Sequence, residues 1–181
     1  TELAAGVQMV FVDRPVPGID ADTVLTDNVG GARTGVEHLI AHGHQRIAFF
    51  SDRASLYTTV NRRAGYALAL ENAGLTVDPA LVHSSEDGRY DFAGALRAML
   101  ALPSPPSAVF CSNNRSTVGI LRELAKLDDR PALVGFDDFE IAPTVNVFVT
   151  DDVAAARDAM RPYVALYVGG MGSRKQNFYN Q

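Results

Sequence analysis

The stretch Ala132-Leu133-Val134-Gly135-Phe136-Asp137-Asp138 is an apolar run that ends in two aspartates. The same arrangement occurs earlier, at Ala108-Val109-Phe110-Cys111-Ser112-Asn113-Asn114. Both runs predict buried parallel strands whose carboxyl ends carry polar side chains. Ligands of open α/β sheets bind at that edge, and carboxylate and amide groups pair well with hydroxyls. The two stretches therefore predict a site for a small, sugar-like molecule.

Further strand-like runs alternate along the chain with segments of helical periodicity. We expect strands at residues 7–12, 23–26, 46–51, 81–84, 108–112 and 132–136. We expect helices that start at Asp27 or Asn28 and stop at Gly43, and others over 59–73, 90–102 and 115–127. The side chains predicted to face the core are Val36, Leu39, Ile40, Ala64, Leu68, Ala69, Val118, Leu121 and Leu124. This order predicts an α/β fold, a three-layer sandwich around a mostly parallel sheet.

Composition indicates a globular chain with one real core, since 47% of its 181 residues are hydrophobic and 20% are charged. The net charge of −5 gives no electrostatic reason to expect contact with nucleic acid or an anionic membrane. No apolar stretch is long enough to span a bilayer, and the N-terminus lacks an export signal, so cytoplasm is expected. The single cysteine, Cys111, lies in an apolar run and is interpreted as a buried small hydrophobe.

Six motifs occur in the order and spacing of a known family. They are Val10-Phe11-Val12-Asp13-Arg14-Pro15, Thr26-Asp27-Asn28-Val29-Gly30-Gly31-Ala32, His38-Leu39-Ile40-Ala41-His42-Gly43-His44-Gln45-Arg46-Ile47-Ala48, Arg62-Arg63-Ala64-Gly65-Tyr66, Ser112-Asn113-Asn114 and Gly135-Phe136-Asp137-Asp138. Over about residues 1–139 the chain resembles the effector-binding domain of lactose-repressor/galactose-repressor (LacI/GalR) transcription regulators.

The resemblance implies a fold like that of the type I periplasmic binding proteins, in which two α/β lobes close on a ligand. It also implies a preceding helix-turn-helix headpiece, which this chain is expected to lack. Residues 1–18 are then a remnant of the first lobe, residues 19–139 the second lobe, and residues 140–181 a divergent or fused tail.

Three ligand-binding residues are implied by the motifs of the family. Arg62 matches the effector-binding arginine, whose planar guanidinium can donate to two oxygens; Asn113 and Asp137 match the polar residues that follow the strands. Each has a structural alternative: Arg62 as a solvated charge beside Arg63, Asn113 as a helix cap, and Asp137 as the cap of a turn.

Other polar and aromatic residues are weaker candidates. Asp13, Asp27 and Thr58 could line the same cleft, although capping and surface solvation explain them equally well. Tyr57, Tyr66 and Tyr90 could include one aromatic floor for a sugar ring, although core packing explains each.

Binding rather than catalysis is expected. His38, His42 and His44 have no nearby cysteine or suitable carboxylate to complete a metal site, and imidazoles beside Gly43 suit a helix C-terminus. No Gly-x-Ser-x-Gly elbow or phosphate-binding glycine loop is present, and no cofactor is expected.

The last quarter departs from the regulator pattern. Residues 140–181, especially Leu166-Tyr167-Val168-Gly169-Gly170-Met171-Gly172 and Asn177-Phe178-Tyr179-Asn180, resemble a fragment of a luciferase-like flavin- or deazaflavin-dependent oxidoreductase. That family forms a barrel of eight strands and roughly 250 residues, which this segment cannot supply. A fusion and a divergent regulator terminus both explain the segment.

The sequence therefore predicts the effector-sensing domain of a cytoplasmic LacI-type transcription regulator that is not an enzyme. A transport-type sugar-binding protein fragment and a luciferase-like oxidoreductase fragment are the alternatives. The expected partners are a sugar-like effector, operator DNA through the headpiece, and in some cases a second copy of the chain.

We expect residues 1–181 alone to bind effector weakly and operator DNA not at all. Calorimetry with sugars and salt-dependent operator titrations check the two expectations.

Overall fold

The computed structural model describes residues 9–86 and 90–136. The chain divides into two compact units, and the described residues 9–24 belong to one of them, while residues 25–86 and 90–136 belong to the other. Asp137, Asp138 and the tail at 140–181 lie outside the described residues. The three-part division of the chain at residues 18 and 139 stays a prediction.

The first unit contains a pair of short parallel strands, β1 (Val10–Val12) and β2 (Asp22–Val24). Both are shorter than expected from the apolar runs. The connector leaves β1 through Asp13, which has a φ of 79°, and the Asp13 N–H donates to the Val24 carbonyl at 2.9 Å. A positive φ is uncommon for a residue with a side chain, and aspartate tolerates it better than most.

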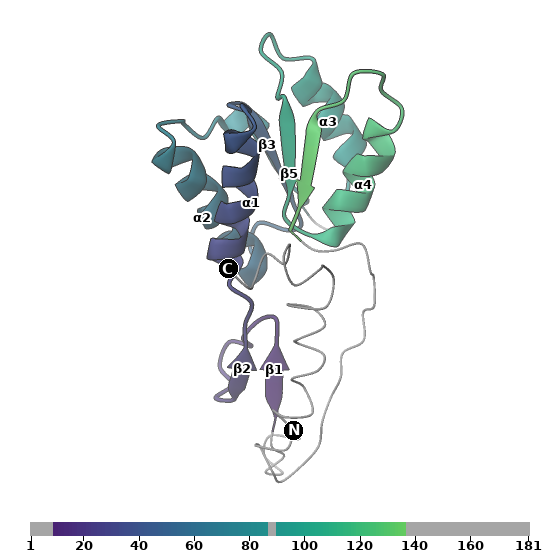
Figure 1. Cartoon of the computed structure of the whole chain (residues 1–181). Helices are drawn as coiled ribbons and strands as arrows, with labels where there is room; N and C mark the ends of the chain where they lie inside the picture. Colours follow the sequence, from purple (N-terminus) through teal and green to yellow (C-terminus); the bar gives the residue numbers. More distant parts are fainter. Residues whose placement is uncertain (1–8, 87–89, 137–181) are drawn as a thin grey trace, which may run out of the picture. The chain divides into compact units, whose positions relative to one another are not determined.

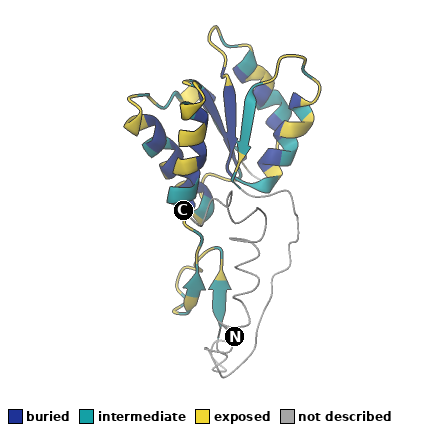
Figure 2. Ribbon diagram, viewed as in Figure 1, coloured by how far each residue is buried: buried dark blue, intermediate teal, exposed yellow. Residues whose placement is uncertain are grey.

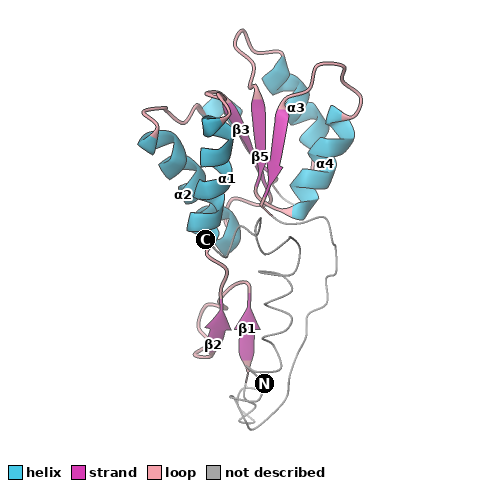
Figure 3. Ribbon diagram, in the orientation of Figure 1, coloured by secondary structure: helices cyan, strands magenta, loops and turns pink. Residues whose placement is uncertain are grey.

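The second unit is built on a four-stranded sheet in which every pairing is parallel, in the order β4-β3-β5-β6 (Figures 1 and 3). The strands are β3 (Ile47–Ser51), β4 (Val82–Ser84), β5 (Ala108–Cys111) and β6 (Ala132–Gly135). Every residue of β3 and β5 is buried, whereas β6 is half-buried except for the exposed Gly135. The two central strands therefore match the continuous apolar runs in the sequence.

Helices cover both faces of this sheet, as Figure 1 shows, with α1 and α2 on one face and α3 and α4 on the other. Their bounds are α1 (Asn28–Ala41), α2 (Tyr57–Asn72), α3 (Phe92–Leu100) and α4 (Asn114–Leu124), with a short 3₁₀ turn, η2 (Pro79–Leu81), before β4. This arrangement confirms the three-layer α/β fold expected from the alternation of elements.

Each face of the sheet has its own hydrophobic core (Figure 2). Under α1 and α2, Phe49 packs against Phe110 and Tyr66, with ring centroids 6.2 and 5.1 Å away. The Tyr66 hydroxyl donates to the Ile47 carbonyl at 2.8 Å, and burial raises the pKa of Tyr66 to about 12. Under α3 and α4, Cys111 is fully buried, and burial raises the pKa of its thiol to about 12. Cys111 is thus a core side chain, as predicted.

Helix ends follow the local signals in the sequence. Asp27, Asp91 and Asn113 each accept a hydrogen bond, at 2.8 Å, from the backbone N–H three residues further on, at the starts of α1, α3 and α4. Gly43 and Gly74 follow the ends of α1 and α2 with φ of 89° and 69°, the left-handed region that favours glycine. Both glycines were expected as helix stops.

Two inward-facing positions were wrongly predicted. Ala64 is exposed, and Leu121 has 43% of its surface exposed. In α4 the buried stripe runs through Thr117, Ile120 and Leu124 instead. The expected stripe was displaced by about one residue, because apolar spacing alone did not fix the rotation of the helix against the sheet. In α2 the buried face includes Arg62 and Gly65, which an apolar pattern does not select.

Close packing of α1 against α2 depends on Gly65. A Cβ atom at this position would lie 2.3 Å from the Val29 carbonyl oxygen and 3.0 Å from the Arg33 nitrogen. Both atoms belong to the backbone of α1, which cannot move aside like a flexible side chain. The absence of a side chain at Gly65 therefore sets how near the two helices can come.

Gly65→Ala and Ala64→Gly separate packing from helix propensity. Propensity alone predicts that Gly65→Ala stabilises and Ala64→Gly destabilises, each by about 1 kcal/mol. Because of the clash with Val29, we expect Gly65→Ala to lower the free energy of unfolding instead, by about 1–3 kcal/mol net. Urea denaturation of the two variants measures this. A stabilised Gly65→Ala variant would contradict the packing argument.

Candidate functional site

Strands β5 and β6 end at one edge of the sheet, where the polar residues that follow them in sequence are expected. They are adjacent and parallel, and the Phe136 N–H donates to the Cys111 carbonyl at 2.8 Å just beyond their ends. Asn113 follows this edge on one strand, and Asp137 is the next residue in sequence after Phe136. The described residues thus support the shared edge, while the placement of the Asp137 side chain stays a prediction.

Arg62 reaches this edge from α2 and is buried there, with 5% of its surface exposed. Its Nε donates to Asn28 Oδ1 at 2.7 Å, and its Nη1 donates to the Ser112 carbonyl oxygen. The centre of its guanidinium lies 3.8 Å from the centroid of the Phe136 ring. Arg62 is therefore not a solvated charge on the helix face; its neighbour Arg63 is the exposed one.

The contacts of Arg62 limit how it could grip a ligand. A guanidinium has five N–H donors, and the Nε donor faces Asn28 while one Nη1 donor faces Ser112. A ligand that approached along the Nε side would have to displace Asn28. A ligand therefore cannot use the Nε donor while the Asn28 contact is kept.

Asn113 is a helix cap, which is the structural alternative considered for it. Its Oδ1 accepts from the Ser116 N–H at 2.8 Å, and its extended backbone, with φ of −158°, places it just before α4. Within residues 9–86 and 90–136, no hydrogen bond involves its Nδ2 group. Capping through oxygen and donation through nitrogen are compatible, so Asn113 offers a ligand an amide donor.

The weaker candidates have different surroundings. Asp27 is exposed and accepts from the Gly30 N–H at 2.8 Å, so it caps α1. Thr58 is half-buried in the first turn of α2. Asp13 belongs to the other unit, where it forms an exposed ion pair with Arg14 at 3.9 Å. A ligand role for each of the three stays a prediction.

Two features of the edge were not predicted. Asn28, expected only as a possible helix cap, is 3% exposed and contacts Arg62. Serines also lie at the ends of three strands. Ser51 and Ser84 are the last residues of β3 and β4, are paired in the sheet and have hydroxyl oxygens 2.7 Å apart, and Ser112 directly follows β5. Ser112 Oγ is buried without a hydrogen-bond partner in the described part of the chain. In the sequence, these serines could have been recognised because a serine directly ends each apolar run.

The three tyrosines considered as a floor for a sugar ring differ in burial. Tyr66 is a core residue, whereas Tyr57 and Tyr90 each have 36% of their surface exposed. The Tyr90 hydroxyl donates to Asp52 Oδ1 at 3.1 Å, and the Arg115 guanidinium lies 4.4 Å from the centroid of its ring. Asp52 follows β3 directly, so Tyr90 also lies beside a carboxyl end of the sheet.

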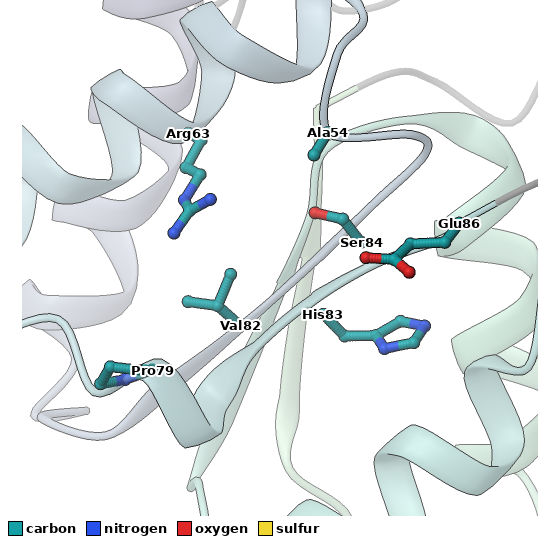
Figure 4. Close-up of a pocket in the computed structure, with 7 residues that line it drawn as sticks. All are labelled: Ala54, Arg63, Pro79, Val82, His83, Ser84 and Glu86. Atoms are coloured by element: carbon teal, nitrogen blue, oxygen red, sulfur yellow. The ribbon is translucent and has the colours of Figure 1, made fainter.

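An open pocket of about 640 Å³ lies along β4 and the neighbouring face of α2 (Figure 4). Its lining residues are Ala54, Arg63, Pro79, Val82, His83, Ser84 and Glu86. None of the predicted ligand-binding residues is among them. The pocket is therefore distinct from the edge formed by the ends of β5 and β6.

Comparison with known proteins gives the family. Residues 2–158 match the family described as periplasmic binding proteins and sugar binding domain of LacI family. The chain belongs to this family. The HTH-type transcriptional regulator CelR of Thermobifida fusca is 35% identical over 145 residues, which are 76% of this chain and 42% of CelR.

Solved structures agree with this membership. A LacI family transcriptional regulator from Mycobacterium smegmatis superposes with a TM-score of 0.59 and 33% identity, over 70% of this chain and 48% of that one. A CelR–cellobiose complex gives a TM-score of 0.59 and 31% identity, over 70% of this chain and 40% of that one. The chain thus spans less than half the length of each of these relatives.

Two further observations bear on the expectations from sequence. The family match extends to residue 158, and so includes the beginning of the segment that resembles an oxidoreductase fragment. This favours a divergent terminus over a fusion for residues 140–158.

Within the described residues, no helix is both long and apolar enough to cross a bilayer.

The surroundings of His83 predict a stability of the second unit that depends on pH. Its ring packs 5.6 and 6.1 Å from the ring centroids of Phe50 and Phe92, and its Nε2 has no hydrogen-bond partner within the described residues. Burial among these rings lowers the pKa of His83, although Asp91 and Glu86 oppose the shift. The folded state therefore favours the neutral imidazole.

We expect His83→Phe to reduce the loss of stability in mild acid. As pH falls through about 6.5, the unfolded chain binds a proton at His83 that the folded chain takes up only at lower pH, so folding weakens. Phenylalanine keeps the aromatic packing without this proton. Urea denaturation of both proteins between about pH 7.5 and about pH 5.5 measures the difference. Parallel stability curves would exclude a role for His83.

Proposed function

We propose that the chain is the effector-sensing domain of a LacI-type transcription regulator and that its effector is a sugar or a related small molecule. The observation that carries the proposal is the placement of the Arg62 guanidinium at the carboxyl ends of β5 and β6, against the Ser112 carbonyl and the Phe136 ring. Family membership and the shared carboxyl edge support the same conclusion.

Complementary polar groups would recognise the effector. Arg62 donates through its guanidinium, Asn113 donates through its amide nitrogen, and Asp137 accepts from paired hydroxyls. Thr58 and Asp27 are secondary contacts, and a ligand role for Asp13, which belongs to the other unit, stays a prediction from sequence. Tyr90 offers an exposed ring at the edge for the apolar face of a sugar. One structural relative is a complex with cellobiose, which supports a sugar as the class of ligand.

In the whole protein, effector binding would change operator affinity. A ligand that binds one conformation more tightly than another shifts their populations, and this coupling alters DNA binding at a distance. The operator contact would come from a helix-turn-helix headpiece, and the protein would act in the cytoplasm, with pairing of two copies as the expected assembly. No catalytic role is proposed.

The two alternatives from sequence explain less. A transport-type binding protein would share the fold, but CelR and the Mycobacterium smegmatis protein are both named as transcription regulators. An oxidoreductase fragment would leave the family match over residues 2–158 without explanation. A regulator therefore accounts for more of the chain.

Asn113→Asp tests the site without disturbing the fold. Aspartate caps a helix as well as asparagine does, so α4 should keep its N-terminal hydrogen bond. The variant loses the Nδ2 donor and places a carboxylate against sugar oxygens. We expect binding of the best sugar among cellobiose, D-ribose and D-galactose to weaken about 10-fold or more, with an unchanged unfolding midpoint. Titration followed by ¹H–¹⁵N NMR detects even millimolar binding.

Asn61→Asp is the matched control, because it makes the same charge change at an asparagine whose side chain, among the described residues, donates to the Tyr57 carbonyl on its own helix. It should bind the sugar like the wild type. Equal binding by wild type and Asn113→Asp would remove Asn113 from the site. Absence of shifts near residues 62 and 113 with every sugar would overturn a sugar effector for this chain.

A further inference from the structure

Arg62 contacts α1 through Asn28 as well as the residue that follows β5, Ser112. Asn28 is the first residue of α1, and its Oδ1 accepts from Arg62 Nε at 2.7 Å. Both side chains are buried, with 3% and 5% of their surfaces exposed. A buried cation requires such acceptors, since its charge is no longer solvated by water.

The Asn28 amide is itself locked in one orientation. Its Nδ2 donates to the Thr26 carbonyl at 3.0 Å, and its backbone N–H donates to the same oxygen at 2.8 Å. A flipped amide would set its NH₂ group against the Arg62 Nε–H and its oxygen against the Thr26 carbonyl. Only one arrangement satisfies both partners, so the acceptor of Asn28 points at Nε before any ligand arrives.

The plane of the guanidinium is fixed by a second contact that also depends on α1. The Arg62 guanidinium lies over the Phe136 ring, and the same ring approaches Gly31, where a Cβ atom would lie 2.8 Å from Phe136 Cε2. The ring therefore fits only because residue 31 has no side chain. Asn28 fixes one edge of the guanidinium, and Phe136, seated on Gly31, fixes its face.

We propose that Asn28 is a positioning residue for the effector site: it fixes the orientation of the Arg62 guanidinium at this site, without contacting the effector itself. This inference rests on the proposed function. Its physical basis is preorganisation, because an arginine that is already held loses little rotamer freedom when a ligand binds.

Asn28→Ala and Asn28→Asp test the proposal. Alanine removes the acceptor and should free the Arg62 side chain, which we expect to weaken binding of the best sugar among cellobiose, D-ribose and D-galactose by about 3- to 10-fold. Aspartate loses the donor to the Thr26 carbonyl but keeps an acceptor toward Nε and adds a charge opposite to that of Arg62, so it should restore most of the affinity. Asn61→Ala, one residue before Arg62 and outside this contact, should bind like the wild type.

Hydrogen exchange of the Arg62 Nε–H, followed by NMR, reports positioning without any sugar. We expect slow exchange in the wild type, Asn28→Asp and Asn61→Ala, and fast exchange in Asn28→Ala. Slow exchange in Asn28→Ala, or fast exchange together with unchanged sugar affinity, would overturn the proposal. If Asn28→Ala does not fold, the Asn28→Asp variant provides the test instead. Fast exchange of the Arg62 Nε–H, or weaker sugar binding, in a folded Asn28→Asp protein would overturn the inference.

A double-mutant cycle with Arg62→Lys distinguishes positioning from a general effect on stability. Lysine has no Nε–H in this position, so Asn28→Ala should weaken sugar binding no further in that background. Additive losses would contradict the proposal. If no sugar binds to the wild type, the proposed effector class fails, while the Nε exchange rates still decide whether Asn28 positions Arg62.

Discussion

The second unit depends on one buried cation. Arg62 lies on α2, donates to Asn28 of α1 and to the carbonyl of Ser112, and stacks on Phe136, which follows β6. A single guanidinium thus ties together two helices and the ends of two strands. Removing an acceptor from such a group leaves a charge without solvation, which is far more costly than losing a surface ion pair. The residues around Arg62 must therefore supply hydrogen-bond acceptors and leave space for its side chain.

The glycines near Arg62 follow from that constraint. Gly65 lets α2 approach the backbone of α1, and Gly31 lets the Phe136 ring lie against α1. Side chains at either position would separate the elements that Arg62 joins. The close approach of the helices and the buried charge are two aspects of the same packing.

Helix capping and a proposed ligand role coincide in the same side chains. Asp27 and Asn113 cap the helices that follow them, yet each is also a candidate for ligand contact. In short βα connections the residue after a strand is also the residue before a helix, so a polar group there serves both needs. Capping occupies the oxygen of Asn113 and leaves its amide nitrogen for another partner. A capping role is consequently no argument against a binding role.

Local signals determined much of this protein: the apolar runs of β3 and β5, the stops at Gly43 and Gly74, the burial of Cys111 and the family itself could all be predicted from sequence. These features depend on neighbouring residues, whose chemistry is visible in the chain. The rotation of α4, with Leu121 exposed and Ile120 buried, was decided by packing against the sheet. So was the choice between the adjacent arginines 62 and 63, and the contact of Asn28 with a residue 34 positions away. Hydrogen bonds between distant side chains leave no periodic signal, and only the folded arrangement of α1, α2 and the strand ends determines them.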